Sequence, residues 1–253
     1  MSCTMSAELL FTSSIVIGFV AQMVGSSLGM AYSTLSTAVL LSFGISPAMA
    51  SASVHTSEIV NRFSSGYSHF RRGNIDTCLF KKLAGYGMAG AFCGAFVVFW
   101  TPVKVIKPIV ALFLLFMGLR ILLMGRGDNR VPSKKSTLPV GPLGFFGGMI
   151  DVIGGGGWGP VVTSTLVLRG DNPQIVIGTI NFAKFFVAIV ESVTLLTLLK
   201  SPQWYIIGGL IVGGTVAAPL SASLCRKLPP HLLMLLVGAL VCGLSLRTLL
   251  KAF

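Results

Sequence analysis

The feature that most constrains this chain is a glycine-rich interruption that occurs twice, each time inside a long hydrophobic run. The first interruption lies between Gly18 and Gly29, and the second lies between Gly144 and Pro160. A shift of 126 positions, without a gap, superimposes identical residues, among them Gly18 on Gly144, Gly29 on Gly155 and Pro47 on Pro173. A duplicated membrane protein whose hydrophobic segments are broken by glycine at equivalent points is typical of secondary transporters.

The composition excludes a soluble domain. Of the 253 residues, 53% are hydrophobic and 10% are charged, whereas soluble domains carry about 25% charged residues. We therefore expect a multi-pass integral membrane protein. The net charge of +12 comes mainly from Lys and Arg in short loops, which is topology bias and not a nucleic-acid surface. The five cysteines are scattered without metal-ligand spacing, so no metal, disulfide framework or cofactor is predicted.

The hydrophobic runs divide each half of the chain into five pieces. The last three pieces of each half approach or exceed the ~20 residues that a spanning helix needs. The first two are shorter, at about 11–17 residues, and are typical of half-helices or re-entrant hairpins. The pieces are roughly 8–24, 30–43, 47–68, 79–100 and 105–124, then 140–153, 158–168, 174–199, 203–222 and 231–250.

These pieces predict an all-α integral membrane protein of two homologous repeats. Each repeat has a glycine-broken helical hairpin followed by three spanning helices. We place the first repeat at 1–124, a polar cytoplasmic linker at 125–138 and the second repeat at 139–253. Because neither half could bury its polar breaks alone, the repeats together form one transport domain.

Basic loops predict the orientation only in part. Arg71, Arg72, Lys81 and Lys82 lie two spans away from the basic linker, so both clusters are expected on the cytoplasmic side. If each broken pair is a hairpin, the repeats are inverted; if it is one long span, they are parallel. Both arrangements place three further Lys or Arg residues on the cytoplasmic side, so the charge bias does not distinguish them. The short pieces favour the inverted arrangement.

The glycine clusters are candidates for an anion cradle built from backbone. Glycine lets amide groups approach a ligand closely, and a helix that begins after a break presents free N–H groups to it. Small-residue packing between helices is the alternative. The second cluster has four consecutive glycines, while the first is poorer in glycine. The cradle residues are predicted to be Gly25, Ser26, Ser27 and Gly29 with Gly154, Gly155, Gly156 and Gly157.

Ionisable residues inside the hydrophobic runs are costly and usually functional. His55 and Glu58 share one helical face, and the 126-residue shift matches them to Asn181 and Lys184. Lys184, His55 and Asn181 are predicted to bind an oxyanion, and Glu58 or His55 could carry a coupling proton. Alternatively, Glu58 and Lys184 only neutralise each other.

Asp151 precedes the second glycine cluster directly. Its carboxylate could bind a proton, pair with Lys184 or cap the helix that follows the break. Capping is the favoured role, because Asp accepts hydrogen bonds from the first free N–H groups of a helix.

Three motifs resemble the TauE/SafE sulfite exporter family. They are Gly144–Gly157 with Pro160 following, the loop His69–Asp76 and the helix start Gly178–Phe185. The resemblance covers nearly the whole chain. It implies transport of sulfite, sulfonates or related small sulfur oxyanions.

We therefore expect a secondary transporter of a bacterial inner membrane that exports such an anion by alternating access. An uptake permease for organosulfur anions and a passive anion channel are the alternatives, and homodimerisation and proton coupling are open. An enzyme is not expected, because no catalytic constellation converges in the sequence.

Overall fold

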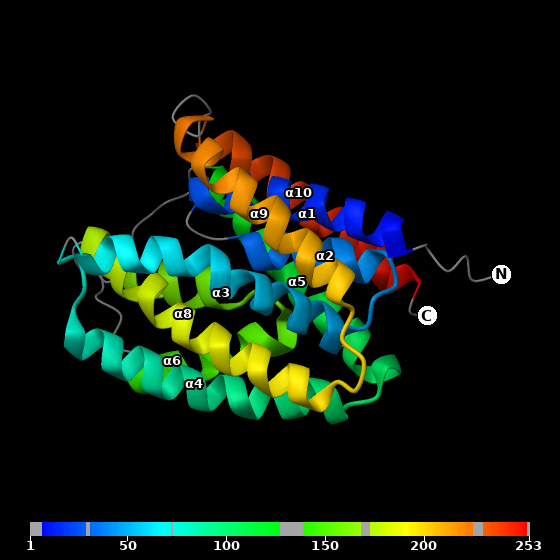
Figure 1. Cartoon of the computed structure of the whole chain (residues 1–253), viewed down its shortest axis with the longest axis horizontal. Coiled ribbons are helices and arrows are strands. Elements are labelled where there is room, and N and C mark those ends of the chain that lie inside the picture. The colour runs from blue at the N-terminus through cyan, green and yellow to red at the C-terminus, as the bar shows by residue number, and fades with distance from the viewer. Residues whose placement is uncertain are drawn as a thin grey trace.

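The computed structural model describes residues 7–28, 31–71, 73–126, 139–167, 173–224 and 230–251. Within these ranges all regular structure is helical, as predicted. The helices lie side by side along the long axis of the molecule, with α9, α10 and α1 in one layer and α4 and α6 at the opposite side (Figure 1).

The first half contains two helices at the predicted break and three long helices after it. The long helices begin at chemically suitable residues: Pro47 opens α3, Asp76 caps α4, and Pro102 precedes α5. The bounds are α1 Ala7–Leu28, α2 Tyr32–Ser42, α3 Pro47–Arg71, α4 Thr77–Trp100 and α5 Val103–Gly125.

The second half repeats this order of elements. A break follows α6, and the returning segment begins as the π-helical turn η1 before it continues as a short α-helix. The bounds are α6 Val140–Gly154, η1 Trp158–Thr163, α7 Ser164–Val167, α8 Pro173–Leu198, α9 Trp204–Leu224 and α10 Pro230–Leu250.

The first helix of each half packs against the fourth helix of the other half, so that α1 lies on α9 and α6 lies on α4. Small residues permit both contacts. A Cβ atom on Gly18 would lie 2.6 Å from the Leu210 carbonyl oxygen, and one on Gly144 would lie 3.2 Å from that of Leu83. Gly18 and Gly144 superimpose in the repeat, so the duplicated glycines at these positions serve close helix packing.

Two further pairs join equivalent helices of the two halves. Helix α3 packs on α8, and α5 packs on α10. Together with the exchanged pairs, these contacts follow a two-fold pattern in which every long interface joins one half to the other. The core between the halves places the polar faces of α3 and α8 against each other.

Six of the described helices are long and apolar enough to cross a membrane: α1, α4, α5, α8, α9 and α10. The α1 helix differs from the expected short piece, because it continues through Gly25 to Leu28 and has 22 residues. At 1.5 Å per residue this length is about 33 Å, enough for the ~30 Å hydrocarbon core. The returning segments are short, with 11 residues in α2.

Candidate functional site

Five ionisable side chains gather in the interior where α3, α6 and α8 meet. His55 and Glu58 come from α3, Asp151 comes from α6, and Lys184 and Glu191 come from α8. Lys184 is 1% exposed and the other four are 0% exposed. Burial of so many charges is costly unless each is paired, so the cluster is a candidate functional site.

Lys184 lies at the centre of the cluster. Its ammonium group donates to the Asp151 carboxylate and, over 2.7 Å, to Glu191 Oε2. It also lies 3.4 Å from Glu58 Oε2. One cation thus contacts three carboxylates from three helices, and it ties the two halves of the chain together.

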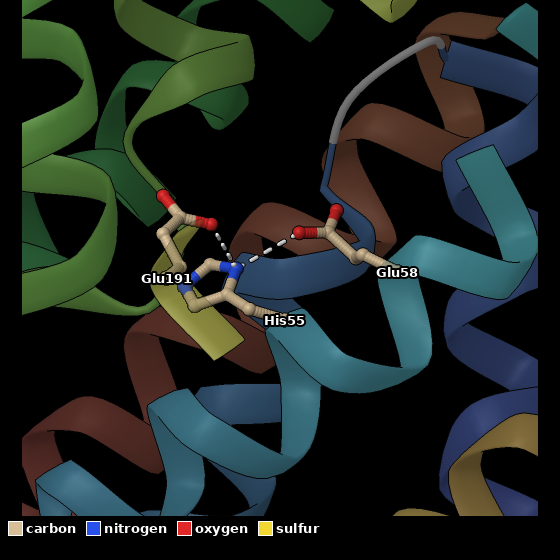
Figure 2. Close-up of side chains that lie close together, drawn as sticks. All are labelled: His55, Glu58 and Glu191. Carbon is tan, nitrogen blue, oxygen red and sulfur yellow. Dashed lines mark hydrogen bonds and ion pairs between the residues drawn. The ribbon is translucent and has the colours of Figure 1, made fainter. Parts of the chain in front are cut away.

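His55 lies between two of these carboxylates. Its Nδ1 atom is 3.0 Å from Glu58 Oε2 and 3.1 Å from Glu191 Oε2 (Figure 2). Both carboxylate oxygens are acceptors, so a proton on Nδ1 allows His55 to donate to either of them. The i, i+3 spacing that placed His55 and Glu58 on one face is confirmed by their contact.

Asp151 closes the break after α6. Its Oδ1 atom accepts hydrogen bonds from the main-chain N–H groups of Gly157, at 2.6 Å, and Trp158, at 2.9 Å. The expectation of free N–H groups at this break is therefore wrong for these two, because the carboxylate already takes them. Two roles considered for Asp151, helix capping and pairing with Lys184, occur together.

The helices are interrupted at the two places that the glycines predicted, and the short helix of the first half meets the break of the second. Thr34 Oγ1 donates to the Gly156 carbonyl at 2.9 Å, and Thr37 Oγ1 donates to that of Gly155 at 2.8 Å. Gly155 has a φ of +64°, which favours glycine. Two buried hydroxyls thus satisfy carbonyl groups that the break leaves outside a helix.

Arg62 lies at the edge of the cluster, with a side chain that is 20% exposed. It donates to Asn181 Oδ1 at 2.7 Å and to Glu58 Oε1 at 3.2 Å. Asn181 therefore joins the network through Arg62, and its carbonyl oxygen is already in use.

A histidine and two carboxylates lie close enough together to be considered as ligands of a metal ion. The ligand atoms of His55, Glu58 and Glu191 lie within 4.8 Å of one another. The Lys184 ammonium lies among the same atoms, 2.7 Å from Glu191 Oε2 and 3.4 Å from His55 Nδ1. Since the Lys184 ammonium already fills the space between these atoms and compensates the charge of the carboxylates, the arrangement does not fit a metal site.

Some predicted cradle residues lie apart from the cluster or beyond description. Gly25 packs against α2, where a Cβ atom on it would lie 2.8 Å from Tyr32 Cβ. Ser26 and Ser27 end α1, but their side chains are outside the described part of the chain, as is Gly29.

Other residues were absent from the predicted site. Glu191 contacts both Lys184 and His55, and Arg62, Thr34 and Thr37 also join the network. The i, i+7 spacing from Lys184 was a usable signal for Glu191. Trp158, the first residue of η1, is buried.

Comparison with known proteins agrees with this architecture. The family model described as Sulfite exporter TauE/SafE matches residues 14–248. A relative from Bacillus subtilis (strain 168), "Probable membrane transporter protein YtnM", is 39% identical over 243 residues, which cover 93% of this chain and 81% of the relative. No solved structure matches. The chain is a multi-pass membrane protein, and it belongs to the TauE/SafE sulfite exporter family.

Proposed function

We propose that this membrane transporter exports a small sulfur-containing oxyanion, sulfite or a sulfonate, across a bacterial inner membrane. The family description supports the class of substrate, and the name of the relative supports transport across a membrane. The buried cluster also supports binding of an oxyanion, because it combines a lysine with main-chain N–H groups at a helix break.

The observation that carries the proposal is the position of the Asp151 carboxylate. A carboxylate is itself a small oxyanion. This one receives N–H groups from Gly157 and Trp158 on one oxygen and the Lys184 ammonium on the other. Helix starts and cations bind sulfur oxyanions by the same donors. We place the transported anion at this point, where it displaces Asp151.

This placement narrows the site predicted from the sequence. The Gly157 N–H and the Lys184 ammonium remain as proposed hydrogen-bond donors to the anion, and the Trp158 N–H is added to them. Asn181 accepts a hydrogen bond from Arg62 through its Oδ1 atom and holds Arg62 in place, and we assign it this positioning role.

The cluster is buried, so the anion reaches it only when helices separate. We propose that access alternates between the two sides. The moving units cross the repeats, since α1 packs on α9 and α6 packs on α4. A whole repeat could not rock by itself without breaking both interfaces. The units that move are therefore α1, α2 and α9 on one side and α4, α6 and η1 on the other.

The substrate is identified by thermal unfolding of the purified protein with sulfite, thiosulfate, sulfoacetate, methanesulfonate, taurine and sulfate. Transport of the stabilising anion is then measured in proteoliposomes. A carrier gives saturable flux and counterflow, in which unlabelled anion inside drives uptake of labelled anion. Flux that rises linearly with concentration and shows no counterflow would indicate a channel and contradict the proposal.

Lys184→Met is expected to abolish transport, while Lys200→Met, at an exposed lysine just after α8, leaves it unchanged. Loss of Lys184 alone leaves three carboxylates poorly paired, which costs about 3–5 kcal/mol of stability. The charge-balanced Lys184→Met/Asp151→Asn variant restores part of this stability but not transport. If the balanced variant transports the anion normally, the pair is only structural and the proposed site is wrong.

A further inference from the structure

The charges of the cluster do not balance without one additional proton. It contains three carboxylates, from Glu58, Asp151 and Glu191, against the two permanent cations Lys184 and Arg62. With a neutral imidazole on His55 the sum is one negative charge. An uncompensated charge in a buried membrane site is strongly disfavoured. One proton on the cluster makes it neutral.

The three carboxylates differ in how well they are compensated. Glu58 has Arg62 on Oε1 and both His55 and Lys184 near Oε2. Asp151 has two N–H groups on Oδ1 and Lys184 on Oδ2. All oxygens of these two carboxylates therefore have a donor or a cation beside them.

Glu191 is the exception. Its Oε2 atom contacts Lys184 and His55, but no described group lies within hydrogen-bond distance of its Oε1 atom. The facing imidazole shows the same pattern, because His55 Nε2 is also buried without a partner among the described residues. Among the residues that the structure describes, the only other buried phenol or charged group on a neighbouring element is Tyr32 of α2, whose hydroxyl lies 2.7 Å from Ser57 Oγ of α3.

Resting on the proposed anion transport, we infer that the His55–Glu191 pair binds one proton with each transported anion. Without that proton, a monovalent oxyanion that displaces Asp151 would raise the net negative charge of Glu58, Asp151, Glu191, Lys184 and Arg62 from one to two. A proton shared across the 3.1 Å between His55 Nδ1 and Glu191 Oε2 offsets that charge. The proton travels with the anion in the same direction, so a monovalent anion crosses without net charge. Export then requires an outward anion gradient that exceeds any opposing pH gradient.

The test uses methanesulfonate, because its sulfonate group stays ionised at every working pH and any pH effect belongs to the protein. Proteoliposomes are held at zero membrane potential with valinomycin and equal potassium. Counterflow without a pH gradient is measured first. If there is none, the proposed function fails for sulfonates, independently of the proton.

Where counterflow is present, a gradient of one pH unit is imposed. One proton per anion predicts about tenfold accumulation on the alkaline side. Glu191→Gln loses this accumulation ratio whatever its exchange rate, whereas Glu8→Gln, at an exposed glutamate of α1, keeps it. No accumulation by the wild type overturns proton coupling, and tenfold accumulation by Glu191→Gln overturns the assignment to this pair.

A measurement on the wild type alone guards against misfolding of the Glu191 variant. Calorimetric titration with methanesulfonate in two buffers of different ionisation enthalpy gives the number of protons taken up on binding. The expected value at neutral pH is between zero and one and rises toward one as the pH increases, because the pair is then less protonated before the anion binds. A value of zero across the pH range overturns the inference.

Discussion

At the scale of single residues, the site is organised around competition for Lys184. Its ammonium contacts Asp151, Glu191 and Glu58, so no donor capacity is left for a solute in the closed protein. Asp151 holds the two N–H groups of the break as well. We regard this carboxylate as a tethered competitor that an entering oxyanion replaces.

Asp151→Asn is therefore expected to bind the oxyanion more tightly. The neutral amide can still accept an N–H group, but it no longer competes as an anion for Lys184. Weakening this competition by ~1.4 kcal/mol lowers the Kd about tenfold. Isothermal titration measures the change. The matched control is Asp76→Asn, which alters an exposed capping aspartate at the start of α4 and should leave the Kd unchanged. Unchanged or weaker binding by Asp151→Asn would contradict the competition.

At the scale of elements, the two breaks have different roles. The second break carries the N–H groups that Asp151 binds, while α2 of the first half supplies Thr34 and Thr37 to its carbonyl groups. This asymmetry agrees with the poorer glycine content of the first cluster. The break depends on Gly155, whose φ of +64° is left-handed and whose Cβ position faces the Thr37 side chain.

Gly155→Ala should accordingly destabilise the protein by about 1–3 kcal/mol, through backbone strain and crowding against Thr37. Thermal unfolding in detergent measures the loss. Gly85→Ala is the control, because that helical glycine of α4 has open space around its Cβ position; this change should be neutral or stabilise by up to ~1 kcal/mol. Equal midpoints for the two variants would show that the conformation of the break does not matter.

The sequence predicts those elements whose determining residues lie within a single segment of the chain. Hydrophobicity and glycine patterns lie within one segment, so the helices and both interruptions could be predicted. The full length of α1 could not, because glycine disfavours a helix interior and yet Gly25, which lies close to Tyr32 of α2, is helical. The cluster depends on how α3, α6 and α8 pack together, which no single segment encodes. His55, Glu58 and Lys184 were identified because they are ionisable residues inside hydrophobic runs, whereas the i, i+7 spacing that indicates Glu191 was not used to include it in the site.

At the scale of the whole molecule, the two halves are packed into one body, because the long helix interfaces join one half to the other. Each half contributes its first helix to the fourth helix of the other. The hairpin form of both breaks favours inverted repeats. In that arrangement the α3–α4 loop and the α8–α9 loop face opposite sides of the membrane.

Cysteine labelling tests this topology. In a variant without the five native cysteines, Lys81→Cys and Lys200→Cys mark the two loops at exposed lysines. An impermeant maleimide added to intact cells should label Lys200→Cys and reach Lys81→Cys only after the membrane is opened. Labelling of both positions from the same side would instead indicate parallel repeats.

The central claim concerns the point where the anion binds, and a heavy-atom analogue tests it most directly. Selenite has the shape and charge of sulfite, and selenium scatters X-rays anomalously. Crystals grown with selenite should show an anomalous peak about 3–4 Å from Lys184 Nζ, beside the N–H groups of Gly157 and Trp158, with the Asp151 carboxylate displaced. A peak elsewhere, with Asp151 still accepting both N–H groups, would contradict the account.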